Sequence, residues 1–285
     1  MRSAFVHLRL PFQLLLAPIF LWGWLLSGGG WSPRVGLAFV AFHVFLYGGA
    51  TAFNSYYDRD VGPVGGLAAP PPVSGGLLPF SLAVKAIGWA LAWLVNPIVF
   101  WLYGGFVLLS LVYSHPRVRL KARPVASLLV VAVGQGVLAF LAAWAASRDE
   151  LTSAWSRDGV LGTLAATLVV LGLYPLTQLF QVDEDRLRGD RTLAVAWGAR
   201  ASFLVALGCL LAGGTSLVSV VLVRFGTPDG VLLGVGLGLE LVAIAFWARH
   251  FDPQAVMRNY GRVMRLNASC AAALSADLVY RLVAP

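Results

Sequence analysis

Residues 35–60 read VGLAFVAFHVFLYGGATAFNSYYDRD, and the run from 35 to 54 contains no Asp, Glu, Lys or Arg. An α-helix of about 20 apolar residues crosses the roughly 30 Å hydrocarbon core of a bilayer. The segment therefore predicts a transmembrane helix over residues 35–54. The carboxylates of Asp58 and Asp60 follow directly, so the helix is expected to deliver them to one membrane surface.

The rest of the chain has the same apolar character. Of its 285 residues, 59% are hydrophobic and 12% are charged, and the mean hydropathy is +0.78, whereas about 25% of the residues of a soluble domain are charged. This composition excludes one or two soluble domains and predicts an all-α, polytopic membrane protein with nine transmembrane helices. The helices are expected over residues 10–28, 35–54, 77–96, 98–114, 125–146, 159–180, 201–224, 228–248 and 266–283.

Asn96-Pro97 separates the third expected helix from the fourth. Proline removes a backbone donor and disfavours helical conformation in the residue before it. The pair therefore predicts a tight turn between two antiparallel helices. A single helix broken at this point is the alternative.

Basic residues lie mainly on one side of the predicted membrane protein. Sixteen of the 21 Lys and Arg residues fall on the side that holds the N-terminus and the loops after the even-numbered spans. Because short basic loops stay in the cytoplasm, we expect this side to face the cytoplasm, in a bacterial cytoplasmic membrane. The net charge of +8 is then explained by attraction to anionic lipid headgroups, and the sequence contains no nucleic-acid-binding motif.

Two of the spans end in a similar polar pattern on this basic side. Asn54 is followed four residues later by Asp58, and Gln181 is followed four residues later by Asp185. On a continuing helix each pair shares one face. If the two helix ends face each other, their carboxylates can hold magnesium ions that bridge to the phosphates of a diphosphate. Solvated loop side chains are the alternative for any one of these charges.

Three motifs in order make the chain resemble the UbiA superfamily of intramembrane prenyltransferases. NSYYDRD at 54–60 looks like the first aspartate-rich motif of the family, DEDRLRGDRTLAVAWG at 183–198 looks like the second, and YSHPRVRLKAR at 113–123 resembles the segment after the fourth helix. The resemblance covers essentially the whole chain. It implies nine transmembrane helices in a ring-like bundle, forming one domain over 1–285 with a pseudo-repeat of 10–114 and 125–224 and two C-terminal helices.

The resemblance also implies roles for individual residues. Family members bind magnesium and an isoprenyl diphosphate, so Mg²⁺ is the expected cofactor, and the diphosphate, a lipophilic acceptor and membrane lipid are the expected partners. Asp58, Asp185 and Asn54 are the expected catalytic residues. The expected metal ligands are Asp58, Asp60, Gln181, Asp183 and Asp185, the expected diphosphate-binding residues are Arg119, Lys121 and Arg191, and the expected prenyl-pocket residues are Tyr57, Trp101, Tyr113 and Tyr174.

Two positions depart from the motifs of the family. Gly62 and Gln181 stand where the first and second motifs usually carry aspartate. Neither residue holds magnesium as a carboxylate does, so the sequence does not fix the number of metal ions. The uncharged stretch 62–72 is rich in glycine and proline, which predicts either a mobile lid or an irregular connection.

Three functions are compatible with these residues. In the first, a prenyl group is transferred from an isoprenyl diphosphate to a lipophilic acceptor. In the second, the altered aspartate motifs belong to a terpene cyclase, in which double bonds of the prenyl chain itself attack the allylic cation. The third is a non-catalytic lipid-binding or scaffolding membrane protein, and the presence of both Asp58 and Asp185 argues against it. The sequence favours prenyl transfer.

Overall fold

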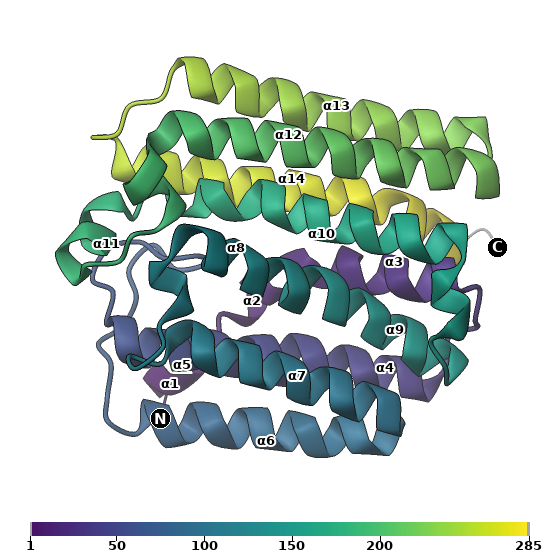
Figure 1. The fold of residues 1–285 in the computed structure, drawn as a ribbon, viewed down its shortest axis with the longest axis horizontal. Helices are drawn as coiled ribbons and strands as arrows, with labels where there is room; N and C mark the ends of the chain where they lie inside the picture. Colours follow the sequence, from purple (N-terminus) through teal and green to yellow (C-terminus); the bar gives the residue numbers. More distant parts are fainter. Residues whose placement is uncertain (1, 284–285) are drawn as a thin grey trace.

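The long helices lie side by side along one direction of the molecule (Figure 1). The structure is a computed structural model that describes residues 2–283, apart from the side chains of residues 2, 277 and 280–283. Helices make up most of this range, and no β-strand occurs in it. The predicted all-α membrane fold is therefore confirmed.

Eight helical runs in the described range are long and apolar enough to cross a membrane. They are Ser3–Ser27, Pro33–Asp58, Leu77–Val95, Pro97–Ser114, Pro124–Arg148, Arg157–Thr177, Leu193–Arg224 and Thr227–Arg249. Each run overlaps one of the first eight predicted spans. The ninth predicted span lies within α14 (Val256–Val283), whose N-terminal half carries three arginines. The protein is thus an integral membrane protein.

Three of these runs combine shorter elements. The first contains α1 (Arg2–Val6), α2 (Leu10–Gln13), the 3₁₀ turn η1 (Leu14–Leu16) and α3 (Ala17–Ser27). The second contains α4 (Pro33–Val40), the π-helical η2 (Ala41–Leu46) and α5 (Tyr47–Asp58). The fifth contains α8 (Pro124–Val131), the π-helical η4 (Ala132–Leu138) and α9 (Ala139–Arg148).

Four of the other five spans are single helices, and the span Leu193–Arg224 is kinked at Gly198, where the backbone leaves helical geometry (φ 80°, ψ 174°). The helices are α6 (Leu77–Val95), α7 (Pro97–Ser114), α10 (Arg157–Thr177), α12 (Leu193–Arg224) and α13 (Thr227–Arg249). The connecting elements are η3 (Leu120–Ala122), η5 (Thr152–Trp155) and α11 (Val182–Arg188).

Asn96 forms the turn between α6 and α7. Its side-chain oxygen accepts a hydrogen bond from the backbone N–H of Val99 at 2.8 Å, which caps α7, and its amide donates to the carbonyl of Ala145 at 2.9 Å. Because α6 and α7 pack against each other, the predicted antiparallel pair is confirmed and the alternative of one broken helix is wrong.

Small residues allow the helices to approach closely. The helix α9 packs against α3, where a Cβ atom on Gly23 would clash with the carbonyl oxygen of Phe140 and lie 3.2 Å from Ala143 Cβ. Five alanines of α9 are buried in the bundle, namely Ala139, Ala142, Ala143, Ala145 and Ala146. Lipid tails are as apolar as a leucine side chain, so close van der Waals contact between helices is what holds such a bundle together.

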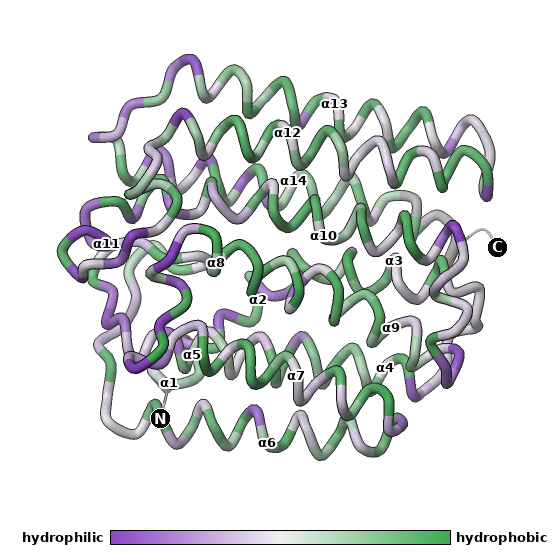
Figure 2. Tube along the Cα trace, in the orientation of Figure 1, coloured by the Kyte–Doolittle hydropathy of each residue, from purple (hydrophilic) through white to green (hydrophobic). Residues whose placement is uncertain are grey.

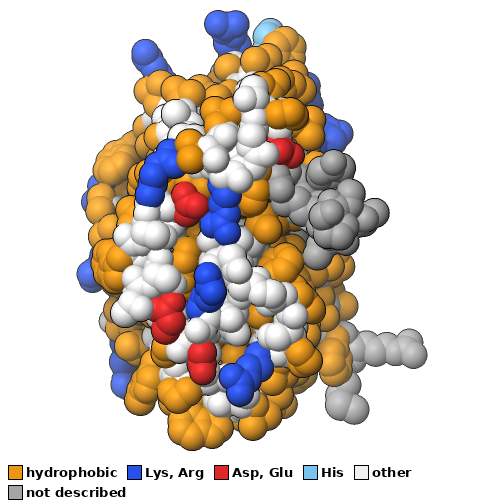
Figure 3. Space-filling model, turned by 90° about the vertical axis from the view of Figure 1, so that its right-hand side faces the viewer, with side chains coloured by type: hydrophobic (Ala, Val, Ile, Leu, Met, Phe, Trp, Pro, Cys, Tyr) orange, Lys and Arg blue, Asp and Glu red, His pale blue; other side chains and the backbone are white. Residues whose placement is uncertain are grey.

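Polar residues gather at the two ends of the bundle (Figure 2). Figure 3 shows the end away from α11, where basic and acidic side chains are scattered inside a hydrophobic rim. At the opposite end, the loops that follow α5 and α7 meet the segment around α11 through hydrogen bonds and ion pairs. These three loops carry the three sequence motifs.

Candidate functional site

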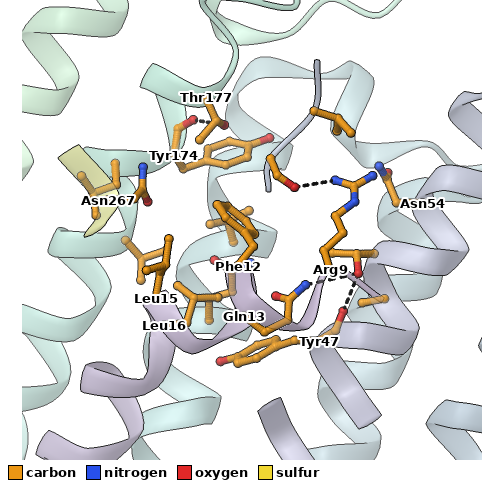
Figure 4. A pocket seen from close by; sticks show the side chains of 18 of the residues that line it. Arg9, Phe12, Gln13, Leu15, Leu16, Tyr47, Asn54, Tyr174, Thr177 and Asn267 are labelled. Atoms are coloured by element: carbon orange, nitrogen blue, oxygen red, sulfur yellow. Dashed lines mark hydrogen bonds between the residues drawn. The ribbon is translucent and has the colours of Figure 1, made fainter. Parts of the chain in front are cut away.

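A cavity of about 250 Å³ lies near the end of the bundle that carries α11. Its walls come from α2, η1 and α3, from α5, α7, α8, η4 and α10, and from α11 and α14. Figure 4 shows Arg9 and Asn54 on one side of the cavity, and Tyr174, Thr177 and Asn267 on the other. The end nearest α11 is lined by charged side chains, whereas most of the remaining wall is apolar.

The first charged wall is the end of α5. Asn54 and Asp58 both line the cavity, as their spacing predicts, and Asn54 Oδ1 accepts a hydrogen bond from Ser114 Oγ at 2.8 Å. The helix ends at Asp58 because Arg59 adopts a left-handed conformation with φ of 52°. Asp60 therefore also lines the cavity, with its side chain 3% exposed.

The second charged wall is formed by α11 and the turn that follows it. Gln181 and Asp185 line the cavity, and Asp185 Oδ2 accepts a hydrogen bond from Thr192 Oγ1 at 3.1 Å. The helix ends at Gly189, whose φ of 77° is readily adopted by glycine. The chain then reverses, so that the side chain of Asp190 is buried in the same wall.

Lys121 and Arg119 connect the two walls. Lys121 forms an ion pair with Asp58 and lies 3.9 Å from Asp190. Arg119 does not itself line the cavity, but it binds both carboxylate oxygens of Asp190, at 2.6 and 2.8 Å, and lies 3.4 Å from Asp58. The bidentate geometry is the arrangement in which a guanidinium holds a carboxylate best.

Arg188 makes a second connection between the walls. Its guanidinium lies 2.5 Å from Asp60 and 2.6 Å from Asp185. Burial raises the pKa of Asp185 to about 6, against the opposing effect of Arg188. Burial also raises the pKa of Asp60, and the neighbouring Asp58 raises it further. Both carboxylates would be stabilised in the charged form by an additional cation.

Arg9 is a buried cation of the cavity wall and makes no ion pair within 4 Å in the described part of the chain. Its guanidinium donates to Ser55 Oγ at 2.7 Å and to the carbonyl of Gly65 at 3.3 Å, but the buried Nε has no hydrogen-bond partner among the described atoms. A buried guanidinium with no carboxylate at ion-pair distance is available to an anion that enters the cavity.

The apolar part of the cavity begins beside two tyrosines. The hydroxyl groups of Tyr113 on α7 and Tyr174 on α10 lie 2.8 Å apart, and both residues line the cavity. The sequence analysis predicts both residues in a prenyl pocket. Further from the charges the wall contains Tyr47, Phe106 and aliphatic side chains, together with the polar residues Ser110 and Gln135.

Asp183 and Arg191 do not line the cavity, contrary to expectation. Residues two positions apart on a helix are separated by about 200° around its axis, so Asp183 points away from Asp185, and its side chain is 81% exposed. Arg191 follows the turn at Gly189 and is exposed. Arg188, three residues after Asp185 on the same helix face, supplies the cation that was expected from Arg191.

Tyr57 and Trp101 also lie outside the cavity wall, contrary to expectation. Trp101 is 70% exposed and stands thirteen residues before Ser114 on α7, so it lies about 20 Å along the helix from the charged end. Tyr57 instead packs against the rings of Phe53 and His115.

The loop between α5 and α6 contributes Val64 and Gly65 to the cavity wall. Glu184 of α11 binds this loop by accepting hydrogen bonds from the backbone N–H groups of Val61 and Gly62. A Cβ atom on residue 62 would lie 2.9 Å from Glu184 Oε1, so glycine permits the close approach. The carboxylate of Glu184 thus ties the loop to the second wall.

Arg9, Arg188 and Asp190 are the site residues that sequence reasoning missed. Arg188 could have been found because it lies three residues from Asp185, at a spacing that shares a helix face. Asp190 follows a glycine, which signals a helix end and a reversal. Arg9 is a lone cation directly before the first apolar span, and this position alone does not show that it is buried.

Comparison with known proteins identifies relatives over most of the chain. Residues 15–268 match the model of the UbiA prenyltransferase family. A protoheme IX farnesyltransferase of Aeropyrum pernix is 26% identical over 176 residues, which are 59% of this chain and 55% of that protein, so the chain spans little more than half of this relative. A digeranylgeranylglyceryl phosphate synthase of Natronomonas pharaonis is 28% identical over 247 residues, with 81% of each chain covered.

Solved structures share the fold. A UbiA homolog from Archaeoglobus fulgidus bound to GPP and Mg²⁺ superimposes with a TM-score of 0.67, at 19% identity, over 96% of this chain and 99% of that one.

Proposed function

The chain belongs to the UbiA prenyltransferase family, and we propose that it is an intramembrane prenyltransferase that moves a prenyl group from an isoprenyl diphosphate to a lipophilic acceptor. The observation that carries this proposal is a single cavity with buried carboxylates and cations at one end and an apolar wall beyond them. The charged end suits a diphosphate, and the apolar part suits a prenyl chain. Relatives named as a farnesyltransferase and as a digeranylgeranylglyceryl phosphate synthase support the reaction class.

The residues of the charged end fit a magnesium ion that binds together with the diphosphate. Asp58 and Asp60 on one wall and Asp185 on the other are the proposed ligands, with the amide oxygens of Asn54 and Gln181 assisting. No group of three or more His, Cys, Asp or Glu side chains within the described residues is placed to hold an ion by itself. Magnesium commonly binds one or two protein carboxylates and completes its coordination with water and substrate phosphates.

The chain's own cations would stabilise the leaving group. When bound, magnesium neutralises negative charge that grows on the diphosphate as the allylic carbon–oxygen bond breaks. Lys121 and Arg188 are paired with carboxylates that could turn to a metal ion, which would release both cations to the phosphate oxygens. Arg9 needs no such release, and Arg119 would hold Asp190 and the loop in place. Preorganised charges of this kind stabilise a transition state most in a site that excludes water.

The tyrosines would stabilise the prenyl fragment that is left as an allylic cation when the carbon–oxygen bond breaks. Tyr113 and Tyr174 lie in the wall next to the charged end. Their rings offer π faces to an allylic cation, and the surrounding apolar wall keeps water from capturing it.

A terpene cyclase is the second candidate. No histidine is among the described residues that line the wall, and Asp58, Asp60, Asp185 and Asp190 are all engaged by cations. A free general base for an acceptor is therefore not evident among the described lining residues, and a cyclase needs no acceptor.

We also propose that the α11 end faces the cytoplasm, in a bacterial cytoplasmic membrane. The loops around the cavity contain Arg117, Arg119, Lys121 and Arg123, and short loops rich in basic residues stay on the cytoplasmic side. A water-soluble diphosphate would then enter from the cytoplasm, and the acceptor from the bilayer.

The test uses purified protein in lipid nanodiscs with magnesium and allylic diphosphates, with and without a panel of phenolic and polar-lipid acceptors. Diphosphate release that depends on an acceptor supports the transferase, whereas cyclic products without acceptor support the cyclase. Asp58→Ala and Asp185→Ala should each abolish turnover. Asp183→Ala, an exposed carboxylate of the same motif, is the matched control and should retain it. Full activity of both cavity variants would refute the site.

A further inference from the structure

The apolar part of the cavity ends at one depth on several helices. The last lining residues are Phe106 on α7, Val169 on α10 and Leu274 on α14. One turn further on each helix, Tyr103, Ala166 and Leu278 are buried but do not line the cavity. The cavity therefore has a closed floor within the bundle.

The distance from the charged end to this floor can be estimated along α7. Ser114 marks the charged end because it is hydrogen-bonded to Asn54, and Phe106 lies eight residues before it, or about 12 Å along the helix axis. Three successive backbone bonds span at most about 3.5 Å, so the four chain bonds of one isoprenyl unit span about 5 Å when extended. A depth of about 12 Å thus holds between two and three isoprenyl units.

The floor combines closely packed aromatic rings with the side chain of Gln135 on η4, which also lines the cavity. The ring of Phe106 lies edge-on to Tyr47, with ring centroids 5.5 Å apart, and Phe42 packs beneath at 6.5 Å. On the η4 side, a Cβ atom on Gly134 would come within 2.8 Å of the Phe106 ring. The ring fills the space that Gly134 leaves open, and it has no room to retract in that direction.

We propose that Phe106, seated against Tyr47 and Gly134, is the specificity residue that limits the donor to diphosphates with two or three isoprenyl units. This inference rests on the proposed prenyltransferase function and names the donor class of the same site. Replacing Phe106 by alanine removes a benzene ring, which is comparable in size to one isoprenyl unit. The variant should accept a donor that is one unit longer.

The experiment compares kcat/KM for allylic diphosphates of one to five isoprenyl units, with a single acceptor at saturation. The wild type should decline steeply beyond three units, because one misplaced methylene in an apolar pocket changes kcat/KM by roughly 10 to 200-fold. Phe106→Ala should raise the ratio of four-unit to two-unit donors at least ten-fold. Gly134→Ala, which pushes the ring into the cavity, should shift the preference towards shorter donors.

Phe246→Ala is the matched control, because this phenylalanine on α13 is 61% exposed on the outer surface of the bundle. It should leave the donor ratios unchanged. Phe106→Leu removes less volume and replaces the alanine variant if that variant does not fold. It should also raise the ratio of kcat/KM for four-unit donors to that for two-unit donors. Both variants should move the preference in the direction of longer chains.

Two outcomes overturn the inference and are distinguishable. If the wild type turns over long and short donors equally and Phe106→Ala leaves the ratios unchanged, the floor does not set chain length, and a long chain leaves the cavity sideways. If the wild type consumes no allylic diphosphate of any length, the proposed function itself is wrong, and the inference falls with it.

Discussion

Replacing Gly62 by aspartate is expected to lower the free energy of unfolding rather than to complete a metal site. Aspartate is the residue that the first motif of the UbiA family usually carries at this position. In this chain, however, the backbone N–H of Gly62 donates to Glu184, and a Cβ atom on residue 62 would lie 2.9 Å from Glu184 Oε1. The new carboxylate would therefore face an existing carboxylate at close range.

The size of the effect follows from the two contributions. Displacing the Glu184 carboxylate weakens a hydrogen bond to a charged group, which is worth about 1.5–3 kcal/mol. Two like charges 4 Å apart repel by about 4 kcal/mol at an effective dielectric constant of 20, and solvent at the 28% exposed Glu184 side chain reduces this. We expect Gly62→Ala, which tests only the steric contribution, to lower the free energy of unfolding by about 1 kcal/mol. We expect Gly62→Asp to lower it by roughly 2–4 kcal/mol.

Thermal unfolding and magnesium titration in the presence of inorganic diphosphate would measure both consequences. Gly62→Asp should unfold at a lower temperature than Gly62→Ala and bind magnesium no more tightly than the wild type. The double variant Gly62→Asp, Glu184→Gln should recover part of the stability, because the repulsion is removed. Tighter magnesium binding by Gly62→Asp at unchanged stability would refute the reasoning.

Three further results are expected. Arg188→Gln should lower kcat/KM by roughly 100-fold, because it removes a charge aimed at the leaving group, whereas Arg191→Gln, on the exposed side of the turn, should stay within about two-fold of the wild type by the same steady-state assay. Trp101→Ala should likewise change kcat/KM by less than about two-fold, since the residue lies at the far end of α7, and a larger loss would place it in the site. Chelation of magnesium should abolish diphosphate release while circular dichroism shows unchanged helix content, because ion pairs within the site hold its walls without metal.

The fold could be predicted from the sequence because each span carries its own signal. A bilayer requires every backbone polar group to be satisfied within the segment, so apolar length alone indicates a helix. The Asn96-Pro97 turn could be predicted for a similar reason, since proline and a capping side chain act locally. The π-helical segments η2 and η4 have no comparable signal and were not predicted.

The site was predictable only where a helix continues unbroken. Asn54 and Asp58 share a face of α5 and line the cavity. The second motif contains a short helix and a reversal at Gly189, so linear spacing does not tell which of its charges turn inwards. For that reason Asp183 was expected in the cavity and Arg188 was not. Arg9 comes from a distant part of the chain, and only tertiary packing brings it to Ser55.

The charges of the site explain why metal and diphosphate should bind together. Four cations meet carboxylates at the charged end, namely Arg9, Arg119, Lys121 and Arg188 with Asp58, Asp60, Asp185 and Asp190. The carboxylate of Glu184 also lies 3.6 Å from Arg188. The carboxylates thus at least balance the cations, so a diphosphate alone would have to compete with them for the same cations. A magnesium ion alone would face the reverse competition. If both entered, Asp58, Asp60 and Asp185 would bind the ion, and Lys121 and Arg188 would become free to bind phosphate oxygens. Each ligand would thus remove the obstacle to the other. By linkage, the factor by which magnesium strengthens diphosphate binding must equal the factor by which diphosphate strengthens magnesium binding.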